Sequence, residues 1–221
     1  MLEDGYNKFV TALALNVNVV IFSLCENTLQ VLLVPFSGDT WALPEKSVTV
    51  DESLEAAALS AFSRSPHPPE IYLEQLYTYG EPQRIPGQRA VSVVYFALIP
   101  LHARGAELES MRWHRLDKLP GLAHDHTDIV AYALRRLRYK LEYSAVGFEL
   151  LPDEFTLSEL QHTYEIILGE TLDKRNFRRR ILDAAIIEAT LHRRSGDGRP
   201  AQLYRYRPDA VAEVKARRLF P

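Results

Sequence analysis

The sequence contains a single cysteine, Cys25, among its 221 residues. One thiol cannot form a disulfide within the chain, and it excludes any metal site built from several cysteines. Long apolar runs are also missing, because none approaches the roughly 20 residues that a membrane-spanning helix needs. The first residues, MLEDGYNKF, carry acids where a signal peptide has a positively charged region. We therefore expect a cytoplasmic protein that does not enter a membrane.

The chain lacks a large net charge, since its formal value is −3, but its charges are unevenly distributed. Residues 1–171 carry 13 Lys and Arg against 23 Asp and Glu, a net of −10, whereas residues 172–207 carry 10 against 4, a net of +6. A basic segment on an otherwise acidic protein directs an anionic polymer to one face. A solvated basic helix would give similar counts, but two basic elements around one short connection favour a nucleic acid as partner.

Strands and helices alternate in the first part of the chain. Runs rich in β-branched and aromatic residues predict strands at 11–23, 28–35, 71–79, 90–99 and about 111–115. Apolar residues at helical spacing predict one helix that begins at Asp51 or Ser53 and ends near Ser65, and a second from about His126 to Tyr143. Strands mixed with helices in this way indicate an α/β fold, an α/β/α sandwich over residues 1–142.

The pattern changes after YSAVGFELLPDE (143–154), which is the expected domain boundary. Thr156 and Glu159 form a capping box before an apolar stripe, and Gly169 ends that helix. Asp173 can cap a second helix, KRNFRRRILDAA, and IIEATLHRR and QLYRYR then predict a two-stranded hairpin. Helix, turn, helix and hairpin in this order are typical of a winged helix-turn-helix domain, which we expect over residues 150–221.

The second of these helices places its cations on one side. At 100° per residue, Arg175, Arg178 and Arg179 fall within about 100° of one another, opposite Phe177 and Ile181. Arginine can pair with guanine and asparagine with adenine, whereas lysine mostly binds phosphate. Any one of these arginines could serve only to solvate the surface, but the arrangement favours DNA. The predicted DNA contacts are Lys174, Arg175, Asn176, Arg178, Arg179, Arg193, Arg194 and Arg199.

The stretch WALPEKSVTVDESLEAAALSAFSRSP (41–66) has the frame of a diphosphate-hydrolysing site without its carboxylates. It resembles the Nudix box, whose pattern is Gly, five residues, Glu, seven residues, then Arg-Glu-hydrophobic-x-Glu-Glu-x-Gly-hydrophobic. With Glu52 on the first glutamate, only that residue and the hydrophobic Phe62 agree with the pattern. The departures are Lys46 for the first glycine, Ser60 for the arginine, Ala61, Arg64 and Ser65 for the three helical glutamates, and His67 for the closing glycine.

These departures remove the chemistry of hydrolysis. Mg²⁺ needs oxygen ligands, and a helix supplies them through carboxylates one turn apart. A methyl group, a guanidinium and a hydroxyl stand at those positions, and Glu52 alone cannot hold the ion. We therefore predict no catalytic residue, no metal and no cofactor. The segment could also be a plain amphipathic helix that never bound a nucleotide.

Two longer segments, YLEQLYTYGEPQRIPGQRAVSVVYFALI (72–99) and the stretch from FTLSELQHTYEI to QLYRYRP, resemble the Nudix-related transcriptional regulators of NAD metabolism. The resemblance covers nearly the whole chain in the right order. It implies a Nudix-like domain that senses ADP-ribose or a related nucleotide, and a winged domain that represses NAD-metabolism genes as a homodimer. A dimer of winged domains reads a palindromic operator on double-stranded DNA.

An anionic effector requires cations and an aromatic ring in the Nudix-like domain. Arg84 and Arg89 lie in the long loop between two predicted strands and suit a diphosphate. Trp41 or Tyr77 could stack on a base, and Glu52 completes the effector-binding set. His124, Asp125 and His126 are adjacent in sequence and cannot converge on one metal ion, so we expect a helix cap there.

Two other functions remain open at this point. The chain could be a diphosphate hydrolase with an unusual metal site and an accessory nucleic-acid domain. It could also be a constitutive DNA-binding protein whose Nudix-like half is purely structural.

Overall fold

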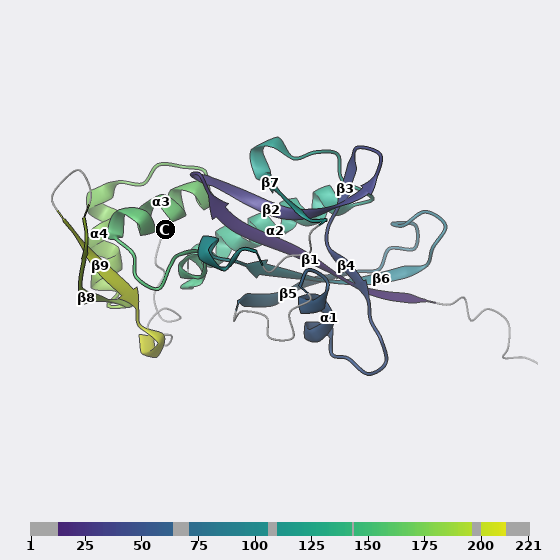
Figure 1. Ribbon diagram of the computed structural model, residues 1–221, viewed down its shortest axis with the longest axis horizontal. Coiled ribbons are helices and arrows are strands. Elements are labelled where there is room, and N and C mark those ends of the chain that lie inside the picture. Colours follow the sequence, from purple (N-terminus) through teal and green to yellow (C-terminus); the bar gives the residue numbers. More distant parts are fainter. Residues whose placement is uncertain (1–12, 64–70, 106–109, 143, 196–199, 211–221) are drawn as a thin grey trace, which may run out of the picture.

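The computed structural model describes residues 13–63, 71–105, 110–142, 144–195 and 200–210 (Figure 1). A mixed seven-stranded sheet organises the first half of the chain. In order along the sheet, β3, β2, β1, β6 and β5 are neighbours, while β4 also pairs with β1 and β7 with β2. Strands β1 and β6 run parallel, and the other pairs are antiparallel. The strands are β1 (Ala14–Cys25), β2 (Thr28–Ser37), β3 (Thr40–Ala42), β4 (Glu45–Ser47), β5 (Tyr72–Tyr79), β6 (Ala90–Leu98) and β7 (Arg112–Arg115).

A helix covers each face of this sheet. Successive side chains of a strand point to opposite faces, so β1 contributes to two cores. Val17, Val19 and Ile21 pack with α1 (Leu54–Ser60), whereas Val20 and Phe22 pack with α2 (His126–Leu141). The central strand is therefore apolar on both sides, and the predicted α/β/α sandwich is confirmed.

The sequence did not place every element of this half correctly. Helix α1 ends at Ser60 rather than near Ser65. The chain continues as a turn in which the Leu59 carbonyl accepts the N–H groups of both Phe62 and Ser63. Ser53, not Asp51, is its N-cap and accepts the Ala56 N–H at 3.1 Å. Strands β3 and β4 were missed, since three residues carry too little periodicity to be recognised.

The second half has the predicted winged helix-turn-helix order. Helices α3 (Leu157–Leu168) and α4 (Lys174–Asp183) precede a hairpin of β8 (Ile187–Arg194) and β9 (Ala201–Tyr206). Thr156 and Glu159 form the expected capping box, and Gly169 ends α3 in the left-handed region at φ 78°. Short 3-10 helices add η1 (Leu101–Ala103), η2 (Leu116–Lys118), η3 (Val146–Leu150) and η4 (Pro208–Ala210).

The segment between the halves is packed rather than exposed. Helix η3 buries Val146, Gly147, Phe148 and Leu150. A Cβ on Gly147 would lie 2.8 Å from Cε2 of Tyr164, so only glycine allows α3 to approach this closely. The residues expected as a boundary therefore form part of the hydrophobic core.

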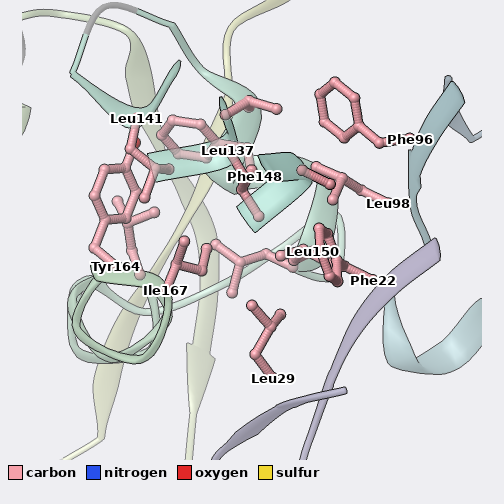
Figure 2. Packing of buried hydrophobic residues seen from close by; sticks show 14 of the residues in the cluster. Phe22, Leu29, Phe96, Leu98, Leu137, Leu141, Phe148, Leu150, Tyr164 and Ile167 are labelled. Atoms are coloured by element: carbon pink, nitrogen blue, oxygen red, sulfur yellow. The ribbon is translucent and has the colours of Figure 1, made fainter. Parts of the chain in front are cut away.

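One hydrophobic cluster runs from the sheet into the winged half. Side chains from β1, β2 and β6 meet those of α2, η3 and α3 in a single core (Figure 2). The cluster continues through Tyr164, whose ring lies 5.6 Å from that of Phe177, to Ile181 on α4. In the described residues, no helix is long and apolar enough to span a membrane.

Candidate functional site

Helix α4 forms the base of a candidate nucleic-acid interface. The Asp173 carboxylate caps it by accepting the Asn176 N–H at 2.7 Å. Phe177 and Ile181 are buried against α3, as the spacing predicted, and Ala184 is buried with them. Packing of this apolar side fixes the rotation of the helix and turns its basic side outward.

The predicted DNA contacts on α4 occupy two environments. Lys174, Arg175 and Arg179 are exposed on the outer side, and Arg179 Nη2 donates to Asn176 Oδ1 at 2.9 Å. Arg178 is half-buried and donates from Nη2 to Ser158 Oγ at 3.1 Å, in the first turn of α3. The outer side thus presents an asparagine amide between cations, which suits base edges flanked by phosphates.

The predicted DNA contacts on the hairpin also occupy different environments. Arg193 is exposed, whereas the Arg194 guanidinium forms an ion pair with the Glu159 carboxylate of the capping box. Arg194 Nη2 also donates to the Glu154 carbonyl at 3.2 Å, so this arginine fastens the hairpin to the start of α3. Arg199, together with Asp197 of the turn, lies outside the described residues.

The remains of the Nudix box gather around a lysine. Lys46 Nζ on β4 lies 2.5 Å from Glu52 Oε2 and 2.9 Å from Ser60 Oγ at the end of α1. Glu52 Oε1 accepts the Thr49 N–H at 2.9 Å. The Lys46 ammonium, with the Thr49 N–H, holds the pKa of the Glu52 carboxyl below its ordinary value. Arg64, Ser65 and His67 lie outside the described residues.

The divalent cation that a complete Nudix box implies does not fit these residues. The single box carboxylate, Glu52, is already neutralised by an ammonium, and Ala61 is a buried methyl group. Across the described ranges, no group of three or more His, Cys, Asp and Glu side chains could hold a metal ion. A hard cation needs several oxygen ligands, and this cluster offers one shared carboxylate.

Arg84 lies on the opposite face of the sheet, beside the start of α2. It donates to both carboxylate oxygens of Asp125, at 2.9 and 2.8 Å, and to Ser92 Oγ on β6 at 2.8 Å. Its side chain is only 4% exposed. Arg89 donates to the Gly80 carbonyl at 2.8 Å and so closes its own loop. Both predicted arginines therefore stabilise the structure around β5 and β6.

The two predicted aromatic residues lie apart. Trp41 on β3 is half-buried, and its ring meets that of His114 at 4.3 Å between centroids. Tyr77 on β5 is 57% exposed and lies against the rings of Tyr79 and Tyr132. The five predicted effector residues are thus divided, with Glu52 on the α1 face and Arg84 on the α2 face.

Sequence reasoning missed the partners at the start of α2. Asp125 is the N-cap residue of α2, as the expected helix cap requires, but its carboxylate makes no cap bond and binds Arg84 instead. His126 is buried, and its Nδ1 accepts the Leu43 N–H at 3.1 Å. Burial lowers the pKa of His126 to about 4, so the imidazole is neutral. No local sequence pattern predicts the bond between Leu43 and His126, since the two residues are 83 positions apart.

Known proteins are similar to this chain over both the sheet half and the winged half. Residues 147–206 match the domain family described as the NrtR DNA-binding winged helix domain. The ADPR-responsive (ADP-ribose-responsive) transcriptional repressor NtrR of Acinetobacter baylyi is 37% identical over 203 residues, which cover 87% of this chain and 81% of that protein. The crystal structure of Shewanella oneidensis NrtR with a 27mer DNA is similar at a TM-score of 0.78 and 34% identity, covering 92% of this chain and 96% of that chain.

A more distant structure supports the fold alone. A MutT/nudix family protein from Enterococcus faecalis has a TM-score of 0.69 at 22% identity over 92% of this chain and 88% of its own. Fold and sequence together define a class of two-part proteins, with a Nudix-like half followed by a winged DNA-binding half. Within that class, the chain belongs to the NrtR family of transcriptional regulators.

Proposed function

We propose that this protein is a DNA-binding transcriptional repressor of NAD-metabolism genes and that ADP-ribose or a related nucleotide controls it. The observation that carries the proposal is the exposed basic side of α4 in a chain that is 37% identical to an ADPR-responsive repressor over most of its length. Similarity to a bacterial DNA-binding repressor supports a cytoplasmic location for this regulator.

In this proposal residues 150–221 read double-stranded DNA. Arg175, Arg179 and Asn176 contact base edges and Lys174 contacts a phosphate. Arg178, Arg193, Arg194 and Arg199 form the flanking contacts, although Arg194 must first leave Glu159. Two copies read a palindromic operator, because one winged domain covers only a half-site.

Residues 1–142 sense the effector and form the homodimer. The half-exposed ring of Trp41 or the exposed ring of Tyr77 stacks on a base. Arg84, beside the start of α2, and Arg89, in the β5–β6 loop, contact the diphosphate once the effector displaces their present partners, and Glu52 holds the box cluster together on the other face. The protein is not a hydrolase, because the box lacks the carboxylates that would hold a metal ion.

A gel-shift titration on the DNA upstream of the protein's own gene tests the proposal. The complex should weaken steeply as salt increases, because binding releases counterions from phosphates. Adding ADP-ribose should change the apparent affinity. If no nucleotide in a panel of NAD-related metabolites changes the affinity for DNA, sensing is refuted and the protein is a constitutive DNA-binding protein. Cleavage of ADP-ribose in the presence of Mg²⁺ or Mn²⁺ would refute the assignment as a non-enzyme.

A further inference from the structure

Lys46, Glu52 and Ser60, which occupy positions of the Nudix box, form a hydrogen-bonded cluster. They are therefore not simply the remainder of a metal site that has lost its ligands. Box positions that carry a glycine, a glutamate and an arginine in hydrolases carry here a lysine, a glutamate and a serine. The lysine ammonium bonds the other two at 2.5 and 2.9 Å. The box pattern places an arginine at position 60 on the helix, where this chain has the hydroxyl of Ser60. The positive charge is instead carried by Lys46 on β4.

This arrangement holds a positive charge in a fixed position. Strand β4 pairs with β1 so that Lys46 faces Val17, which belongs to the core under α1. Figure 1 shows β4 beside α1. An ammonium has three N–H donors, and Glu52 and Ser60 accept from two of them. The Lys46 side chain is 33% exposed and that of Glu52 is 15% exposed, so the lysine is the more exposed member of the pair.

Arg84, another cation proposed for the effector, is less available. Three N–H donors of Arg84 are engaged by Asp125 and Ser92, and its side chain is 4% exposed. Phosphate oxygens would have to compete there with a carboxylate that chelates the same guanidinium. The Lys46 ammonium is also paired with a carboxylate, but through one N–H donor, and its side chain is more exposed than that of Arg84.

We infer that Lys46 replaces the divalent metal of the Nudix box and binds the effector's phosphate group directly, so that effector binding requires no metal. The inference rests on the proposed sensing function and names the part of the effector that this cluster recognises. The Lys46 ammonium, although paired with Glu52, can donate a charge-assisted hydrogen bond to a phosphate oxygen. It cannot activate water as a metal ion does, and this accounts for recognition without hydrolysis.

Calorimetric titration of the full-length protein with ADP-ribose, in EDTA and then in Mg²⁺, tests the inference. The wild-type protein should bind with the same affinity in both buffers, and adenosine, which lacks phosphates, should bind much more weakly. Lys46→Met should weaken ADP-ribose binding about tenfold or more, because a charge-assisted bond is lost. Lys118→Met changes the net charge equally at an exposed position of η2 and should have no effect.

A second variant separates ligand contact from structural support. Lys46→Met leaves the Glu52 carboxylate without its ammonium, whereas K46M/E52Q removes that carboxylate charge as well. If Lys46 contacts the effector, the double variant regains at most the affinity lost to repulsion by the unpaired carboxylate and stays below the wild-type affinity. Recovery of wild-type affinity in the double variant would overturn the inference and leave Lys46 a structural role.

The remaining outcomes distinguish this inference from the proposed function. Binding of ADP-ribose by the wild-type protein only in Mg²⁺ would overturn the metal-free site and leave sensing intact. Binding in neither buffer would refute sensing itself, and this inference with it. Thermal unfolding of each variant without ligand gives a readout that is independent of binding and shows whether the fold is retained.

Discussion

Single residues in this protein are defined by partners that lie far away in the sequence. His126 is an example, because its imidazole is buried and its Nδ1 accepts a backbone N–H from the β3–β4 connection. That bond requires a neutral ring, and desolvation, partly opposed by Asp125, lowers the pKa of His126 to about 4. Nearby His124 and Arg84 lower that pKa further. The residue therefore couples the stability of the sheet half to pH.

The direction of this coupling follows from the two pKa values. The unfolded histidine titrates near 6.5 and the folded one near 4, so only the unfolded chain binds a proton between these values. Stability is therefore fully present above about pH 6.5 and falls as the pH decreases. When the pH is lowered from 7.5 to 5, we expect protonation of His126 in the unfolded chain to reduce the free energy of unfolding by about 2 kcal/mol.

His126→Asn provides the matched comparison, because an amide oxygen can accept the Leu43 N–H but does not titrate. Urea unfolding from pH 5 to 7.5 should show a weaker pH dependence for H126N than for the wild-type protein. Parallel stability profiles for the two proteins would show that the buried imidazole does not control this window.

At the scale of one element, helix α4 carries the most specific functional claim. Its buried side is held by α3, and its outer side exposes Arg175 and Arg179 around Asn176. A cation on a helix that enters a groove contributes both to affinity and to its dependence on salt. The exposed basic side of α4 is therefore open to direct measurement.

Replacing both Arg175 and Arg179 by alanine should weaken operator binding by about tenfold or more per residue, because two guanidinium contacts are lost. Because the proposal places both arginines on base edges, the ratio of operator affinity to affinity for unrelated DNA should also fall. Fluorescence anisotropy with labelled operator and unrelated DNA measures both quantities.

The control changes the same net charge on the sheet half. Arg115 on β7 and Arg135 on α2 are both exposed and far from α4 in the chain. The R115A/R135A protein should bind like the wild type. An equal loss of affinity in both double variants would indicate that net charge, rather than the face of α4, determines binding.

On the scale of the whole molecule, the two halves share one hydrophobic core. The cluster runs from Phe22 under α2 through η3 to Tyr164 and Ile167 on α3 (Figure 2). It continues to Ile181 on α4. Arg138 on α2 adds a polar link, since its Nε donates to the Ile167 carbonyl at the end of α3 at 2.8 Å. A signal from the sheet half to the DNA-binding half therefore does not have to cross a flexible linker.

This continuity predicts that a cavity in α4 destabilises the sheet. Ile181→Ala should cost about 2–5 kcal/mol of unfolding free energy. Both tryptophans, Trp41 and Trp113, lie in the sheet half. Their fluorescence should therefore report a lower urea midpoint that coincides with the midpoint from far-UV circular dichroism.

Leu182→Ala is the matched control, because Leu182 is the exposed neighbour of Ile181 on the same helix. It should leave both midpoints nearly unchanged. A fluorescence midpoint unaffected by I181A would mean that the halves unfold independently, as two domains joined by a boundary at 143–154 would do.

What the sequence determined by itself was local. The caps at Thr156, Gly169 and Asp173, the strand runs and the two-sided helix α4 follow from spacings of a few residues, and the structure confirms them. The missing box carboxylates are likewise a matter of residue identity. Only the tertiary structure decided which partner each charge takes. Arg84 binds Asp125 across 41 positions and Arg194 binds Glu159 across 35, because strand order and helix packing bring such groups together, and residue types in sequence carry no record of that proximity.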